Sequence, residues 1–148
     1  MGYLAKNKIV ILLLITILST IPIIAIKNND LQNNNTKTPI ITINLSKQQL
    51  TFIDENGQKI NFHCSPGKNG YETPKGNFKI YAKEEMAISY KYGNTPMPYT
   101  LWFFGGYGIH ASKSVPNYPA SHGCVRLSIE DAKWLFDRTP VNTPVIIY

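Results

Sequence analysis

Residue types that can perform chemistry together lie close to one another near the end of this 148-residue chain. The stretch "SHGCVR" places His122 two residues before Cys124 and Arg126 two residues after it, and His110 lies twelve residues upstream of His122. A free thiol is mostly protonated at neutral pH, and it becomes a strong nucleophile when a base takes its proton or when positive charge favours the thiolate. The pattern therefore predicts a cysteine nucleophile at Cys124, with His110 or His122 as its base.

The glycine before Cys124 supports the same interpretation. Gly123 gives a substrate carbonyl room to approach the thiol, and the backbone N–H groups of a turn at His122, Gly123 and Cys124 can point at a developing oxyanion. The preceding segment "VPNYPASHG" cannot form regular structure, and sites are often built on such loops. We therefore expect an acyl-transfer type of site in a loop.

Two other interpretations of these residues remain open at this point. His110, His122 and Cys124 can all bind zinc, but a fourth ligand is hard to find, and the His-x-Cys spacing is shorter than structural zinc sites use. A disulfide between Cys64 and Cys124 is the second alternative, because exported domains often pair their cysteines. Such a disulfide would not explain why the histidines and Arg126 lie around Cys124. We expect no metal and no cofactor.

The elements that must position these residues are mostly strands. Apolar and polar residues alternate in "IITINLSKQQLTFIDENGQKINFHC", and Asn56-Gly57 supplies a turn, which predicts an opening hairpin. The alternation puts Cys64 on the apolar face, so we expect a core residue there, and it puts His63 on the opposite face, at the surface. An aromatic strand, "MPYTLWFF", leads through Gly105 and Gly106 to His110.

One helix is expected, directly after the cysteine motif. Ser128 and Asp131 resemble a capping box, and Pro140 ends the segment. Its apolar face is predicted to consist of Ile129, Ala132, Leu135 and Phe136. With roughly six to eight strands and one helix, the chain is predicted to be mainly β, a sandwich or barrel with one short helix after the motif.

The first part of the chain predicts a membrane segment. Ile9 to Ile26 are eighteen residues without a charge, they follow Lys6 and Lys8, and no small-residue cleavage site comes after them. We expect residues 1–27 to be an anchor or an uncleaved signal, 28–38 a polar linker and 39–148 the catalytic domain. The positive-inside rule then places the domain on the extracytoplasmic side, in the cell envelope.

Charge excludes one class of partner. The sequence carries a formal net charge of +6, half of it in residues 1–38, and the remainder on the domain is too small to indicate nucleic-acid binding. The small net positive charge of the domain is compatible with binding to an anionic polymer of the cell envelope. We expect the catalytic domain to be a monomer.

The segment "GIHASKSVPNYPASHGCVRLS" resembles the catalytic signature of the L,D-transpeptidases, the YkuD-type domain. The signature is a histidine, a spacer, and then Ser/Thr-His-Gly-Cys followed by an apolar residue and Arg or Asn. The resemblance covers residues 40 to 148, including "TPKGNF" and the final "NTPVIIY". It implies an L,D-transpeptidase-type β-sandwich or barrel, without a metal or cofactor.

The resemblance also implies a reaction. In that family a cysteine attacks the third residue of a peptidoglycan stem tetrapeptide, D-alanine leaves, and the thioester passes to an amine on another stem. Carried over by position, Cys124 is the nucleophile and His110 is its base and later its acid. The oxyanion pocket and substrate-binding residues are Ser121, His122, Gly123 and Arg126, with Cys124 contributing its own N–H group.

One position departs from the family pattern. Ala111 stands where members often have Ser or Gly, so the group that orients His110 is either a backbone carbonyl near Ala111 or the Ser112 hydroxyl. The rival functions are an L,D-carboxypeptidase, in which water accepts the acyl group, and a non-catalytic cell-wall-binding module. A sortase is disfavoured, because the Thr-Leu-x-Thr-Cys stretch and the distant arginine of that family are missing.

Overall fold

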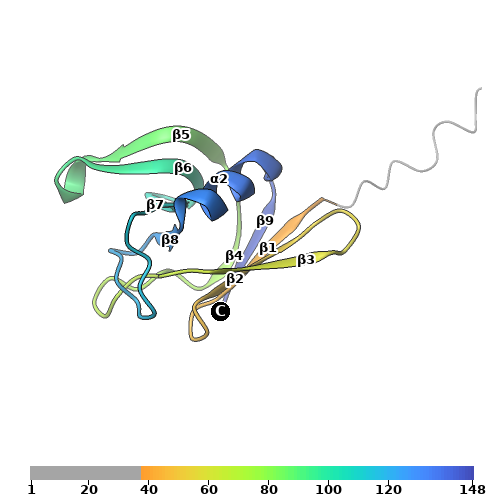
Figure 1. The fold of residues 1–148 in the computed structure, drawn as a ribbon, viewed down its shortest axis with the longest axis horizontal. Helices are drawn as coiled ribbons and strands as arrows, with labels where there is room; N and C mark the ends of the chain where they lie inside the picture. Colours follow the sequence, from red (N-terminus) through yellow and green to blue (C-terminus); the bar gives the residue numbers. More distant parts are fainter. Residues whose placement is uncertain (1–37) are drawn as a thin grey trace, which may run out of the picture. The chain divides into compact units, whose positions relative to one another are not determined.

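The structure, a computed structural model, describes residues 38–148, which form two β-sheets and one α-helix (Figure 1). The predicted anchor and nearly all of the linker lie outside the described residues. Within residues 38–148, no helix has the length and apolar character that crossing a membrane requires. The elements in chain order are β1 (Ile40–Asn44), β2 (Gln49–Ile53), β3 (Lys59–His63), β4 (Gly76–Lys79), β5 (Ala82–Ser89), the 3-10 helix η1 (Tyr90–Tyr92), β6 (Thr95–Phe104), β7 (Tyr107–Ala111), β8 (Val125–Leu127), α2 (Ile129–Arg138) and β9 (Pro144–Ile147).

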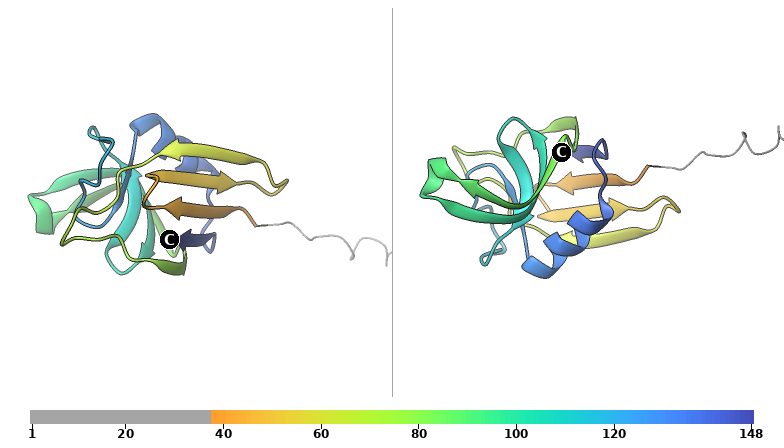
Figure 2. Two further views of the ribbon diagram at one scale, coloured as in Figure 1. Left: turned by 90° about the horizontal axis from the view of Figure 1, so that it is seen from below. Right: turned by 90° about the horizontal axis from the view of Figure 1, so that it is seen from above.

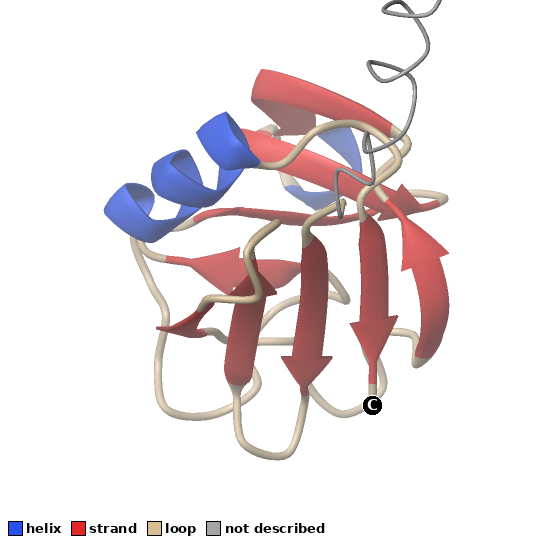
Figure 3. Ribbon diagram, turned by 90° about the vertical axis from the view of Figure 1, so that its right-hand side faces the viewer, coloured by secondary structure: helices blue, strands red, loops and turns tan. Residues whose placement is uncertain are grey.

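The first sheet has five strands in the order β3-β2-β1-β9-β4. Figure 3 draws the strands in red and the helix in blue. The predicted opening hairpin is confirmed: β2 and β3 are antiparallel, and Gly57 adopts the positive φ of +83° that its turn requires. The last strand, β9, pairs in parallel with β1, with Ile41 opposite Val145 and Ile43 opposite Ile147. The two ends of the described part of the chain are therefore joined in one sheet.

The second sheet has four strands in the order β5-β6-β7-β8 and carries the predicted chemistry. Strands β5 and β6 form a long antiparallel hairpin with η1 at its tip, and the hairpin extends away from the first sheet (Figure 2). Strands β7 and β8 are parallel neighbours. The connection between them contains the proline-rich segment and the cysteine motif.

The hydrophobic core takes side chains from both sheets and from α2. Fully buried isoleucines of β1 meet buried residues of β6, β7 and β8, and Trp134 of α2 packs edge to face on Phe52 at 5.5 Å. Cys64 lies in this core with 0% of its surface exposed, which confirms its predicted place. The structure is thus mainly β and sandwich-like, as predicted.

The helix α2 begins where the sequence predicted it. The Ser128 hydroxyl accepts a hydrogen bond from the Asp131 N–H at 3.0 Å, which satisfies an otherwise unpaired donor of the first turn. Ala132 and Leu135 are buried as expected, but the placement of Ile129 on the apolar face is wrong. Ile129 is 44% exposed, because it is the first residue of the helix and lies before the face that meets the core.

The predicted strand count is too low, since residues 38–148 contain nine strands. Strand β5 is the main omission. Its sequence, "AKEEMAIS", has no regular alternation, and its side chains are largely exposed or half-buried. The backbone pairing with β6 holds it in the sheet, and an apolar period is not needed there.

Candidate active site

The parallel pair of β7 and β8 brings the segments that carry the predicted histidine and cysteine side by side. Ile109 and Val125 are paired and point into the core, so the next pair in register, His110 and Arg126, lies on the opposite face. Cys124 comes directly before β8, and the positive charge of Arg126 acts on both its thiol and the His110 imidazole. The Cys124 sulfur lies 3.8 Å from the Gly106 carbonyl oxygen, at the turn that leads into β7.

His110 has a defined tautomer. Its Nδ1 lies 2.7 Å from the carbonyl oxygen of Ala111, and a carbonyl only accepts hydrogen bonds, so Nδ1 carries the proton. In the neutral ring, Nε2 is then the unprotonated nitrogen. Of the two orienting groups expected from the sequence, the backbone carbonyl is the one in place, because the Ser112 hydroxyl donates to the Ser114 carbonyl instead.

Burial keeps this imidazole neutral. His110 is only 6% exposed, and desolvation lowers its pKa to about 4. The hydrogen bond to Ala111 opposes that shift, and the positive charge of Arg126 adds to it. At neutral pH His110 is therefore a neutral base with Nε2 free to accept a proton.

The thiol of Cys124 is protonated in the resting site. Its burial raises the thiol pKa above the usual value, although the backbone N–H of Gly108 and the charge of Arg126 act in the opposite direction. With the thiol and the His110 imidazole both neutral, the thiol must lose its proton as the sulfur attacks. The site is suited to general-base catalysis.

The second cysteine has a different environment. Cys64 and Cys124 are both free thiols, and burial raises the pKa of Cys64 to about 12. Such a thiol is almost never ionised at neutral pH.

The zinc alternative finds no ligand cluster in the described part of the chain. Residues 38–148 contain no group of three or more His, Cys, Asp or Glu side chains placed to hold a metal ion.

Ser121 folds the turn of residues 121–124 that carries the candidate nucleophile, Cys124, and that we call the nucleophile turn. Its hydroxyl accepts a hydrogen bond from the Gly123 N–H at 3.0 Å and donates one to the Cys124 carbonyl oxygen. The Gly123 N–H, one of the three donors expected from this turn, is therefore engaged by Ser121. Among residues 38–148, the N–H groups of His122 and Cys124 have no acceptor and are the donors that remain.

Gly123 is required by its backbone and by a neighbour. Its φ is +115°, and a Cβ placed there would lie 2.4 Å from the ring of Tyr107 on β7. Carbon atoms do not approach so closely, so the ring and the nucleophile turn fit together only without a side chain. The sequence suggested space for substrate here, but the space is filled by Tyr107.

Replacing Gly123 with alanine is therefore expected to destabilise the domain. The positive φ costs about 1–2 kcal/mol for a residue with a Cβ, and overlap with the Tyr107 ring adds about 1–3 kcal/mol. Equilibrium unfolding in urea measures the change. Gly70→Ala is the matched control, since Gly70 has a φ of +80° and open space around the added Cβ. Equal losses for the two variants would show that the Tyr107 contact is unimportant.

His122 lies between two tyrosines that the sequence did not indicate. Its ring stacks on Tyr92 of η1 at 4.4 Å and meets Tyr71 edge to face at 4.7 Å. Its pKa is lowered by partial desolvation and by the positive charges of Lys68, Arg126 and Lys91, in that order. The hairpin tip and the loop before β4 thus both contact the nucleophile turn, although they are distant from it in sequence.

The segment between β7 and β8 is held by residues that sequence reasoning missed. The Ser65 hydroxyl donates to the Tyr118 carbonyl at 2.8 Å, and the Gln48 amide donates to the Pro116 carbonyl at 3.3 Å. Ser65 also exchanges two backbone hydrogen bonds with Arg126. His63 is exposed, as expected, with Nε2 3.3 Å from the same Pro116 carbonyl.

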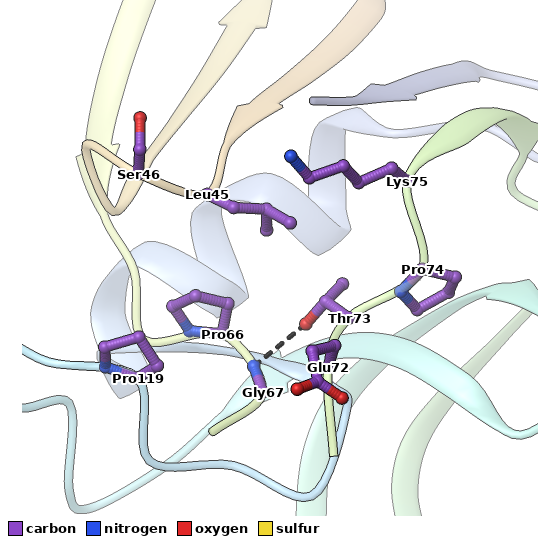
Figure 4. A pocket seen from close by; sticks show the side chains of 9 residues that line it. All are labelled: Leu45, Ser46, Pro66, Gly67, Glu72, Thr73, Pro74, Lys75 and Pro119. Atoms are coloured by element: carbon purple, nitrogen blue, oxygen red, sulfur yellow. Dashed lines mark hydrogen bonds between the residues drawn. The ribbon is translucent and has the colours of Figure 1, made fainter. Parts of the chain in front are cut away.

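A cavity of about 510 Å³ lies beside the loop before β4 (Figure 4). Its wall is largely apolar, and neither His110 nor Cys124 lines it. Thr73 belongs to the wall, and its hydroxyl bonds the Gly67 N–H and the Gly123 carbonyl. The lining residues are Leu45, Ser46, Pro66, Gly67, Glu72, Thr73, Pro74, Lys75 and Pro119.

Comparison with known proteins agrees with the fold. The L,D-transpeptidase from Xylanimonas cellulosilytica (residues 123–326) is 33% identical, with a TM-score of 0.68 over 78% of this chain and 63% of that one. The LD transpeptidase LdtMt1, solved in complex with imipenem, shares the fold at 24% identity, with a TM-score of 0.69 over 75% of this chain and 59% of that one. The chain thus spans about three fifths of these solved proteins. YqjB of Bacillus subtilis (strain 168) is 27% identical over 125 residues, 74% of this chain and 70% of its own.

A family model describes the same part of the chain. Residues 38–147 match the model of the YkuD L,D-transpeptidase catalytic domain. This range contains both sheets, α2, His110 and the cysteine motif. The chain therefore belongs to the family of L,D-transpeptidase catalytic domains.

Proposed function

We propose that the domain is a peptidoglycan L,D-transpeptidase in which Cys124 is the nucleophile. The acyl donor is a stem tetrapeptide, the leaving group is its terminal D-alanine, and the acceptor is an amine on another stem. The observation that supports this most is the arrangement of β7 and β8. In support of it, His110 on β7 carries a neutral imidazole with Nε2 unprotonated, and the partly buried thiol of Cys124 comes directly before β8, under the charge of the same Arg126.

The first half of the reaction forms a thioester. Nε2 of His110 takes the thiol proton as the Cys124 sulfur attacks the carbonyl of the third stem residue. The carbonyl oxygen becomes an oxyanion, which the N–H groups of the nucleophile turn stabilise. When the carbon–nitrogen bond breaks, the imidazolium gives its proton to the leaving D-alanine amine. His110 is then neutral again.

The second half transfers the acyl group. The acceptor amine attacks the thioester carbonyl and loses a proton to His110, and the thiolate of Cys124 leaves and recovers that proton. The positive charges of Lys68, Lys91 and Arg126, which all act on His122, suit the carboxylates that a stem peptide carries. We also propose the extracytoplasmic location derived from the first residues, because the substrate lies in the cell envelope.

Defined muropeptides test the proposal. Incubation of the protein with a tetrapeptide donor and a second stem bearing a free amine is expected to release D-alanine and yield a cross-linked dimer, both detected by mass spectrometry. The Cys124→Ala protein should yield neither product.

The acceptor distinguishes the alternatives. Release of D-alanine with a tripeptide but no dimer would make the protein an L,D-carboxypeptidase. Retention of muropeptides on the protein without any product would indicate a non-catalytic wall-binding module. Either result would contradict the proposed transferase.

A further inference from the structure

The Thr73 hydroxyl joins the loop before β4 to the nucleophile turn. Thr73 is 3% exposed. Its hydroxyl donates to the Gly123 carbonyl oxygen at 2.8 Å and accepts from the Gly67 N–H at 2.9 Å, the second of which is drawn in Figure 4. Because the hydroxyl proton is used toward Gly123 and a lone pair toward Gly67, both bonds have a definite direction. A residue fifty positions before Gly123 therefore holds the turn.

The bonded carbonyl belongs to the peptide unit that contains the Cys124 N–H. A trans peptide is planar, so its C=O and N–H groups point in opposite directions. Fixing the Gly123 oxygen on Thr73 therefore fixes the direction of the Cys124 N–H on the other side of the turn. The hydrogen bond at the oxygen also polarises the peptide and makes its N–H a better donor.

Ser121 does not fix this peptide. Its hydroxyl holds the Gly123 N–H and the Cys124 carbonyl oxygen, which belong to the peptides before and after it. The peptide between them is bonded at its oxygen by Thr73. Its N–H has no acceptor among the described residues and is therefore available to bind a substrate oxygen.

We propose that Thr73 is a positioning residue that aims the Cys124 N–H at the oxyanion of acyl transfer. This inference rests on the proposed function. It predicts that loss of the Thr73 hydroxyl impairs reactions that pass through a tetrahedral oxyanion. Reactions of the same thiol that form no oxyanion should proceed as before.

Two reagents separate these cases. Imipenem acylates a thiol through a tetrahedral oxyanion, whereas iodoacetamide alkylates it by direct displacement of iodide. Thr73→Val keeps the shape and removes the hydroxyl, and Thr73→Ser keeps the hydroxyl and removes the methyl group. We expect Thr73→Val to slow acylation by about two to three orders of magnitude, the usual effect of one oxyanion donor. Its alkylation rate should stay that of the wild type, and Thr73→Ser should restore acylation.

Three results would overturn the role. One is acylation of Thr73→Val at the wild-type rate, and another is failure of Thr73→Ser to restore acylation. The third is an equal fall of acylation and alkylation, which would show that Thr73 only maintains the fold. If Thr73→Val does not fold, as thermal melting would show, Thr73→Ala takes its place in the same two reactions. A wild-type protein that is alkylated but never acylated would instead remove the proposed function.

Discussion

Replacement of Cys124 by alanine is expected to abolish formation of the acyl-enzyme. A carbapenem such as imipenem presents a strained carbonyl to the nucleophile and should leave a thioester, seen by mass spectrometry as an increase of one drug molecule. The wild-type protein should carry this adduct at neutral pH, because His110 is neutral there and can take the thiol proton. The Cys124→Ala protein has no thiol in the site and should carry none.

The control for this experiment is the other cysteine. Cys64 is fully buried in the core, and with a pKa of about 12 only about one thiol in 10⁵ is ionised at pH 7. Cys64→Ala should therefore form the adduct as the wild type does. An adduct that survives in Cys124→Ala and disappears in Cys64→Ala would show that the nucleophile is misassigned.

The sequence was sufficient for features that depend on local patterns. Alternation and Asn56-Gly57 predicted the first hairpin, and Ser128 predicted the start of α2. The parallel pairing of β7 with β8 follows from long-range packing, so only the structure shows that the segment carrying Cys124 lies beside the strand that carries His110. The alternation of apolar and polar residues alone does not determine the register between two strands that a long loop separates.

The parts of the site that were missed come from distant segments. Thr73, Tyr71 and Tyr92 reach the nucleophile turn from the loop before β4 and from the tip of the β5–β6 hairpin. Nothing in their local sequence indicates a contact with residues 121–124. The tautomer of His110 was also beyond the sequence, because it depends on the direction of a single backbone carbonyl.

Gly123 shows how a correct motif can carry an incorrect explanation. The motif requires glycine, and the sequence suggested that the requirement was space for substrate. The structure supplies two other reasons, the positive φ and the Tyr107 ring. It also shows that the Gly123 N–H donates a hydrogen bond to the Ser121 hydroxyl. This N–H therefore shapes the turn, and the N–H groups of His122 and Cys124 remain available as donors.

The two histidines are expected to differ in their effect on the pH dependence of transpeptidation. In the proposed mechanism, His110→Ala removes the general base and acid, which is worth about two to four orders of magnitude in rate. His122→Ala removes the ring that Tyr92 and Tyr71 hold, and so loosens the turn that carries the oxyanion donors. That loss costs about two to three orders of magnitude if one donor is misplaced. Rates alone therefore do not separate the two roles.

The acid limb of the pH–rate profile separates the roles of the two histidines. Protonation of His110 stops catalysis, and burial lowers its pKa from 6.5 to about 4, so kcat/KM of the wild type should stay level as the pH falls through 6 and decline only near pH 4. Since His122 does not accept the thiol proton in the proposed mechanism, His122→Ala should keep this limb at a lower rate.

His110→Ala should lose the limb near pH 4, and its rate should instead decline from a much higher pH. Its remaining activity should follow thiolate formation and rise about tenfold per pH unit up to the raised pKa of Cys124. Measurement of kcat/KM between about pH 3.5 and 9 on one tetrapeptide donor covers both regimes. A profile that loses its acid limb in His122→Ala and keeps it in His110→Ala would make His122 the base, and the hydrogen bond from His110 to Ala111 would then be structural.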